Sequence, residues 1–149
     1  MRVGLIGSSG GHLDQLLALR SFWERHERFW VTFDTPDAAE RLRGERVIAA
    51  HHPTTRNLPN LARNLGLAAR VLPRERPDLL LSTGAGVAVP FFAVGRALGI
   101  RLVWMEVIDR VDSPSLTGRL VAPWADAVLL QWEEQRRFYP RGVVVGPVW

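Results

Sequence analysis

The chain has 149 residues, 47% of them hydrophobic, which suits one domain with a single buried core. It has no cysteine and no lysine, which excludes disulfides, thiolate metal sites, a Walker-type phosphate lysine and Schiff-base chemistry. The net charge of +4 favours an anionic partner, and the arginines form no dense run of the kind that nucleic acid would need.

The first half of the chain alternates apolar runs with segments of helical spacing. In chain order we predict a strand at 2–6, a glycine-rich loop at 7–12, a helix from 13 to about 26, a strand at 29–33, a short helix at 37–43, a strand at 46–50 and a polar loop at 51–57. The next helix carries its apolar residues at helical spacing and should stop at Pro73: Leu58, Leu61, Leu65, Ala68 and Leu72.

The second half repeats this alternation. It predicts a strand at 78–82, a second glycine loop at 83–86, an apolar helix at 87–98, a strand at 101–105, a helix around 115–122, a strand at 127–131, a helical turn at 133–138 and a strand at 143–145. Such alternation indicates an α/β fold with a doubly wound parallel (Rossmann-like) sheet, formed by residues 1–149 as one domain. Both glycine loops should then face one crevice at the carboxyl edge of the sheet.

The first glycine loop is the strongest local signal. It consists of Gly7, Ser8, Ser9, Gly10 and Gly11, followed by His12. Small residues before a helix let backbone N–H groups approach a phosphate, although a tight turn without a ligand fits the same letters. The helix dipole would keep His12 neutral, so that it could accept a proton or donate a hydrogen bond. A simple capping role for His12 stays open.

The second loop, composed of Thr83, Gly84, Ala85 and Gly86, is a further candidate phosphate site. Glu106 directly follows an apolar strand, so it could act as a general base or bind sugar hydroxyls. It could equally form an ion pair with Arg110. Asp34 ends the second strand, where dinucleotide enzymes hold a ribose hydroxyl, but the loop at 7–12 does not match their glycine fingerprint. No histidine or carboxylate set has metal-ligand spacing, and we expect no metal and no cofactor.

Three stretches resemble one family, the bacterial polysaccharide biosynthesis proteins of the PssD type. These stretches are the loop at 7–12 with Leu16, residues 82–90, and residues 105–118 continuing to 131–134 and 139–140. The eukaryotic counterpart is the membrane-anchor subunit of the dolichol-pathway N-acetylglucosaminyltransferase. More distantly, the chain looks like the N-terminal acceptor domain of MurG-type glycosyltransferases of the GT-B fold.

The resemblance implies a split enzyme that is inactive as a single chain. This chain would bind a polyprenyl-diphosphate-linked sugar acceptor, and a separate PssE-like chain would bind the nucleotide sugar. His12 and the first loop would face the acceptor diphosphate, with 83–86 lining the same cleft. Arg110 belongs to the Glu-to-Arg signature of the family and could bind a phosphate or order Glu106. Met105 stands where the MurG-type pattern has a histidine before the glutamate, which departs from that pattern.

The aromatic residues of the last quarter suggest a surface for the partner chain. We expect Trp132, Pro147 and Trp149 in that interface, because a one-chain GT-B enzyme crosses to its second domain at about this point. No secretory signal and no spanning segment are predicted, so we expect a cytoplasmic protein at the inner face of the plasma membrane. Phe91, Phe92 and the arginines of the 58–72 segment, including Arg63 and Arg70, could touch an anionic bilayer, although helix packing explains them equally well.

A non-catalytic scaffold that recruits and activates a catalytic partner is the main alternative function. A small dinucleotide-binding protein is a second alternative, which NAD(P) binding would identify.

Overall fold

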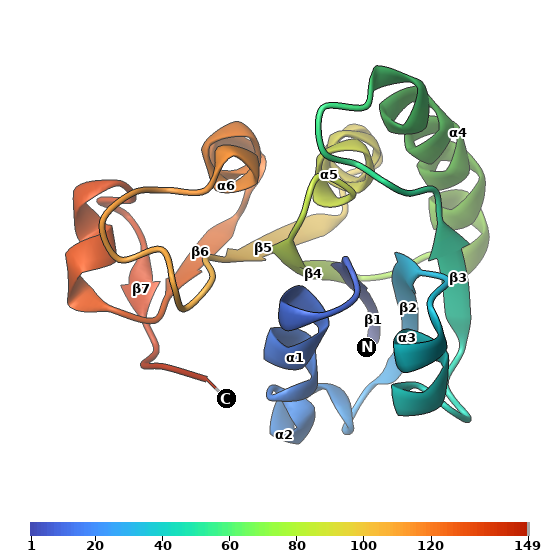
Figure 1. The fold of residues 1–149 in the computed structure, drawn as a ribbon, viewed down its shortest axis with the longest axis horizontal. Helices are drawn as coiled ribbons and strands as arrows, with labels where there is room; N and C mark the ends of the chain where they lie inside the picture. Colours follow the sequence, from blue (N-terminus) through green and yellow to red (C-terminus); the bar gives the residue numbers. More distant parts are fainter. Residues whose placement is uncertain (149) are drawn as a thin grey trace.

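The computed structural model describes residues 1–148, which form a seven-stranded parallel sheet with helices on both faces (Figure 1). The strands are β1 (Arg2–Gly7), β2 (Glu27–Phe33), β3 (Val47–Ala50), β4 (Leu79–Gly84), β5 (Arg101–Met105), β6 (Ala127–Leu130) and β7 (Val143–Val144). Their order is β3-β2-β1-β4-β5-β6-β7. The predicted doubly wound sheet is confirmed, and the strand order reverses between β1 and β4.

The helices divide into two layers. One face carries α1 (Gly11–Leu17), α2 (Arg20–Trp23) and α3 (Pro36–Arg41), and the other carries α4 (Leu58–Glu75), α5 (Ala88–Ala97) and α6 (Leu116–Val121) (Figure 1). Two short 3-10 turns, Ala122–Trp124 and Glu133–Arg137, complete the structure. Alternate residues of β1 serve the two layers: Ile6 packs with α4 and α5, whereas Leu5 packs with α1 and α3.

Two helix predictions need correction. The helix expected from 13 to about 26 is broken, because α1 ends at Leu17 and α2 starts at Arg20. Trp23 turns back and donates its Nε1 hydrogen to the Leu16 carbonyl at 2.9 Å, which satisfies a carbonyl at the end of α1. Helix α4 does not stop at Pro73 but continues to Glu75, with Pro73 exposed in its last turn.

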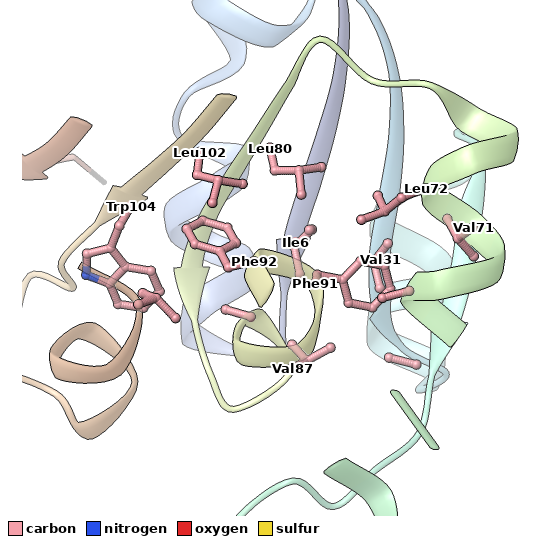
Figure 2. Close-up of a cluster of buried hydrophobic side chains, with 14 of the residues drawn as sticks. Ile6, Val31, Val71, Leu72, Leu80, Val87, Phe91, Phe92, Leu102 and Trp104 are labelled. Carbon is pink, nitrogen blue, oxygen red and sulfur yellow. The ribbon is translucent and has the colours of Figure 1, made fainter. Parts of the chain in front are cut away.

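Phe91 and Phe92 are fully buried, so the expected membrane contact through them is wrong. Both lie on α5 with no exposed surface and pack among Ile6, Leu80 and Leu102 of the sheet (Figure 2). The apolar character of this helix therefore reflects its central position over the sheet.

Helix α4 presents leucines to solvent, contrary to the usual burial of an apolar helical stripe. Leu58, Leu61 and Leu65 are 75%, 39% and 46% exposed. The buried face of the same turns carries Asn60 and Asn64 instead, which are 5% and 0% exposed. Only the later turns bury Ala68 and Leu72 as the spacing would suggest. The first half of α4 thus keeps a partly exposed apolar surface, here called the leucine stripe (Leu58, Leu61 and Leu65).

Candidate functional site

The two glycine loops meet at the point where the strand order reverses. Strands β1 and β4 are direct neighbours, and Gly7 pairs with Gly84 across them. The Ser8 amide donates to the Gly84 carbonyl at 3.0 Å, which joins the two loops by their backbones. The prediction that both loops share one edge of the sheet is confirmed. Parallel α/β sheets bind ligands at this position.

His12 and Thr83 connect the loops a second time. His12 Nδ1 lies 2.8 Å from the Thr83 carbonyl oxygen, and the Thr83 hydroxyl donates to the His12 carbonyl at 2.8 Å. Because a carbonyl oxygen only accepts hydrogen bonds, this contact assigns the proton of a neutral His12 to Nδ1 and leaves Nε2 as an acceptor. Gly84 makes room for the ring, since a Cβ there would lie 2.6 Å from His12 Cε1. Its φ of +123° also favours glycine.

The loops open into a cleft of about 1120 Å³. Six of the predicted catalytic or phosphate-binding residues line it: Gly11, His12, Gly84, Ala85, Gly86 and Arg110. The other six, Gly7, Ser8, Ser9, Gly10, Thr83 and Glu106, are not among its lining residues. Gly7, Ser8 and Thr83 are buried and fix the shape of the loops. Asp34, the candidate ribose ligand of the dinucleotide alternative, is exposed and lies outside this lining.

One side of the cleft, formed by the loop between β3 and α4, contains none of the site residues predicted from the sequence. Thr54, Thr55 and Arg56 line the cleft, and Thr54 lies directly against Gly86 of the second glycine loop. A Cβ added at Gly86 would sit 3.2 Å from Thr54 Cβ. The position of this loop could have been predicted from the sequence, because a loop that follows a parallel strand leaves the sheet at its carboxyl edge.

The charges of the cleft are unevenly compensated. Of its three arginines, Arg41 forms ion pairs with Asp14 and with Asp37. Arg56 and Arg110 have no ion-pair partner within residues 1–148. Asp109 is the remaining charged residue of the lining. The same part of the chain holds no cluster of three metal-ligating side chains.

Among the arginines outside the cleft some are paired, as Arg2 and Arg46 are, and others within residues 1–148, such as Arg43, are not. At the amino edge of the sheet, Glu75 accepts from Arg46 and Arg2, and these guanidinium groups hold the pKa of its carboxyl below the usual range. The cleft at the opposite edge is lined by three arginines and two aspartates, so its charged side chains leave one net positive charge.

Glu106 is buried beneath the cleft with no exposed surface. Its oxygens accept from the Val107 amide at 3.0 Å, from the Ser115 amide at 3.1 Å and from the Ser115 hydroxyl at 3.0 Å, and Tyr139 donates a further short hydrogen bond. The ion pair considered with Arg110 does not form. Glu106 instead ties the cleft-lining segment 107–115 to the start of α6. This geometry favours a positioning role over the general-base role suggested by the sequence.

The close packing around this carboxylate explains why residue 118 is a glycine. A Cβ at Gly118 would lie 2.1 Å from the Tyr139 hydroxyl and 2.7 Å from Glu106 Oε2. Burial raises the pKa of Tyr139, and its hydrogen bond to Glu106 adds to the effect, so the hydroxyl keeps its proton and remains a donor.

The residues predicted for a partner interface lie near the cleft. Trp132 donates its Nε1 hydrogen to the Ile108 carbonyl at 2.6 Å, and Pro147 is exposed. Two buried glutamines hold the segment that includes Pro147: Gln15 donates to the Val148 carbonyl, and the Val148 amide donates to Gln131, both at 2.8 Å. Trp149 lies outside the described residues.

Comparisons with known proteins agree with this architecture. Acinetobacter baumannii MurG superposes with a TM-score of 0.79 at 17% identity, over 99% of this chain and 45% of its own. Neisseria meningitidis UDP-GlcNAc 2-epimerase bound to UDP-GlcNAc superposes with a TM-score of 0.77 at 11% identity, over 99% of this chain and 46% of its own. At these identities the likeness concerns the fold, which is that of one lobe of a GT-B-type protein.

Sequence relatives are more specific. The human UDP-N-acetylglucosamine transferase subunit ALG14 is 30% identical over 91 residues, which cover 57% of this chain and 42% of that protein. The UDP-N-acetylglucosamine--N-acetylmuramyl-(pentapeptide) pyrophosphoryl-undecaprenol N-acetylglucosamine transferase of Symbiobacterium thermophilum is 40% identical over 82 residues, or 55% of this chain and 21% of that protein. The aligned part is thus less than half the length of these relatives. The family model described as "Oligosaccharide biosynthesis protein Alg14 like" matches residues 3–148, and the chain belongs to that family.

Proposed function

We propose that this chain is the acceptor-binding subunit of a two-chain glycosyltransferase. Its cleft would bind a polyprenyl-diphosphate-linked sugar, and a PssE-like chain would bring the nucleotide sugar, with the product entering polysaccharide assembly. Membership of the Alg14-like family and the names of the relatives, which are N-acetylglucosamine transferases or a subunit of one, support this reaction class. The single observation that carries the proposal is a cleft joining two glycine loops, a histidine acceptor and two arginines without carboxylate partners.

His12 is the proposed general base. Sugar transfer breaks the bond between the donor sugar and its nucleotide diphosphate while an acceptor hydroxyl forms the new glycosidic bond and loses its proton. The Nε2 lone pair of His12 can take this proton, because Nδ1 already donates to the Thr83 carbonyl. The same carbonyl then stabilises the charged imidazolium, and the departing diphosphate stays with the donor-binding partner.

The test is the rate of the assembled two-chain enzyme with His12→Ala and His12→Gln. Loss of a general base lowers kcat by about 100-fold to 10,000-fold. His26→Ala is the matched control, because His26 precedes β2 at the opposite edge of the sheet and lies outside the cleft lining. It should retain wild-type turnover. If His12→Ala retains full activity in an intact complex, the scaffold alternative replaces the catalytic role.

The protein is further proposed to act at the inner face of the plasma membrane. Residues 1–148 contain no helix long and apolar enough to cross a bilayer. The leucine stripe on α4 offers an apolar surface for peripheral contact, and Arg63 and Arg70 on the same helix are exposed. This surface takes the place of Phe91 and Phe92 in the membrane hypothesis.

A further inference from the structure

The loop between β3 and α4, residues 51–57, is held by polar side chains on the buried face of α4. Asn64 donates to the His51 carbonyl at 3.0 Å and accepts from the His51 amide at 2.8 Å. Asn60 donates to the Pro53 carbonyl at 2.8 Å. Both asparagines occupy the buried face of α4, where burying a polar side chain is costly unless its hydrogen bonds are made. These hydrogen bonds tie His51 and Pro53 of the loop to α4.

Fixing the loop places Arg56 at the cleft. Thr54 packs on Gly86, which anchors the loop to the second glycine turn, and Arg56 follows two residues later in the cleft lining. Arg56 is exposed, has no ion-pair partner within the described chain, and adopts φ +49°. A residue with a side chain is less favourable than glycine in this left-handed conformation, so the backbone conformation does not itself require an arginine here.

The surroundings of Arg56 also suggest where a lipid-linked ligand would run. Leu58 of the leucine stripe lies two residues beyond Arg56, and Leu116, which is 71% exposed, belongs to the same cleft lining. Helices α4 and α6 lie on the same face of the sheet, with α5 between them (Figure 1). An apolar chain leaving the cleft past Leu58 and Leu116 would hold its diphosphate beside Arg56.

We infer that Arg56 binds the diphosphate of the lipid-linked acceptor, and that the 51–57 loop positions this group against the two glycine loops. This inference rests on the proposed function and adds a specific phosphate ligand to it. A guanidinium group binds phosphate oxygens through paired N–H donors, which matches an otherwise uncompensated arginine in an anion-binding cleft. Arg56 is a binding and positioning residue, separate from the proton transfer assigned to His12.

The test measures binding of farnesyl diphosphate to the full chain by calorimetry, with farnesol, inorganic pyrophosphate and UDP as further probes. Arg56→Ala should weaken farnesyl diphosphate binding about tenfold to 100-fold, the range for a charge-assisted contact. Arg43→Ala is the matched control, because Arg43 is exposed, forms no ion pair within residues 1–148 and does not line the cleft. It should bind as the wild type does.

Arg56→Gly separates binding from folding. Glycine accepts a φ of +49°, so this variant should unfold at a temperature close to that of the wild type and yet bind as weakly as Arg56→Ala. Binding of farnesyl diphosphate that is unchanged in both Arg56 variants overturns the inference and leaves the proposed function standing. An effect of these variants on UDP alone assigns Arg56 to the donor and also overturns it. Failure of the wild type to bind farnesyl diphosphate overturns the inference together with the proposed acceptor site.

Discussion

Tyr139 is the single tyrosine of the chain, so its ionisation can be followed without interference from another phenol. Burial and the hydrogen bond to Glu106 raise its pKa above the ordinary value of 10.0. We therefore predict that the native protein forms no tyrosinate as the pH passes 10.0, whereas the denatured chain does. Near-ultraviolet absorbance during an alkaline titration, with and without guanidinium, measures both states.

The same shift makes folding stability depend on pH, with a defined sign. Below pH 10.0 the phenol is protonated in both states, and its contribution to stability is fully present. As the pH rises beyond that value, the unfolded chain loses the proton and the folded one retains it, so the free energy of unfolding falls. Tyr139→Phe should abolish this part of the alkaline decline. Tyrosinate formation near pH 10.0 in the native protein would contradict the proposed burial of the phenol.

The position of Glu106 in the sheet is predictable from the sequence, but the direction of its side chain is known only from the structure. Its position after an apolar strand correctly predicts the carboxyl edge of the sheet, because that depends on chain order alone. Whether the carboxylate faces the cleft or lies beneath it depends on Ser115 and Tyr139, which are 9 and 33 residues away in sequence. The location of His12 at this edge, in contrast, is predictable from the local sequence alone, because His12 directly follows a glycine loop.

Among the elements, α4 differs most from its sequence pattern. Apolar spacing marks the helix but does not say which of its faces meets the sheet. In the first turns, Asn60 and Asn64 occupy the buried face, where they form hydrogen bonds with backbone groups of the preceding loop. The leucines are displaced to solvent, a result that periodicity alone could not predict. The glycine loops and strands were predictable because β1, β4 and β5 each read as a short apolar run.

We predict that the leucine stripe binds membranes. Replacing Leu58, Leu61 and Leu65 by serine should lower partitioning onto phosphatidylglycerol vesicles about 100-fold, at about 1 kcal/mol for each partly inserted side chain. The temperature of unfolding should change little, because these side chains are already exposed. Co-sedimentation with vesicles measures the effect, and neutral phosphatidylcholine vesicles test the contribution of Arg63 and Arg70.

Leu98→Ser is the matched control for this experiment. Leu98 is 50% exposed at the end of α5 and lies at the amino edge of the sheet, away from the stripe. It should leave partitioning unchanged. Equal vesicle binding by the triple serine variant and the wild type would remove the stripe from the membrane hypothesis.

At the scale of the whole molecule, the candidate cleft and the ion pairs of Glu75 lie at opposite edges of the sheet. At the amino edge, Glu75 forms ion pairs with Arg2 and Arg46. At the carboxyl edge, Arg56 and Arg110 line the cleft without an ion-pair partner among residues 1–148, and the exposed Leu116 lines it with them. A cleft lined by these two arginines and an exposed leucine suits a ligand with an anionic head and an apolar tail. The doubly wound parallel sheet is predictable from the alternation of strands and helices, whereas its strand order and the side of the cleft formed by residues 54–56 appear only in the structure.

The segment near Val148 provides the prediction for assembly with a partner chain. Gln15 lies on α1, three residues after His12, and donates a hydrogen bond to the Val148 carbonyl. The position of this segment is therefore coupled to the helix that carries the proposed base. Deleting residues 147–149, or replacing Gln15 by alanine, should weaken co-purification with a PssE-like partner by about tenfold or more and lower turnover in proportion.

Transferase activity should require both chains, which is measured by mixing them at increasing partner concentration. Thermal unfolding of each variant close to the wild-type temperature is the control that assigns the loss to the interface. Complex formation by the shortened chain at wild-type affinity, or full turnover by the single chain, would contradict the two-chain arrangement.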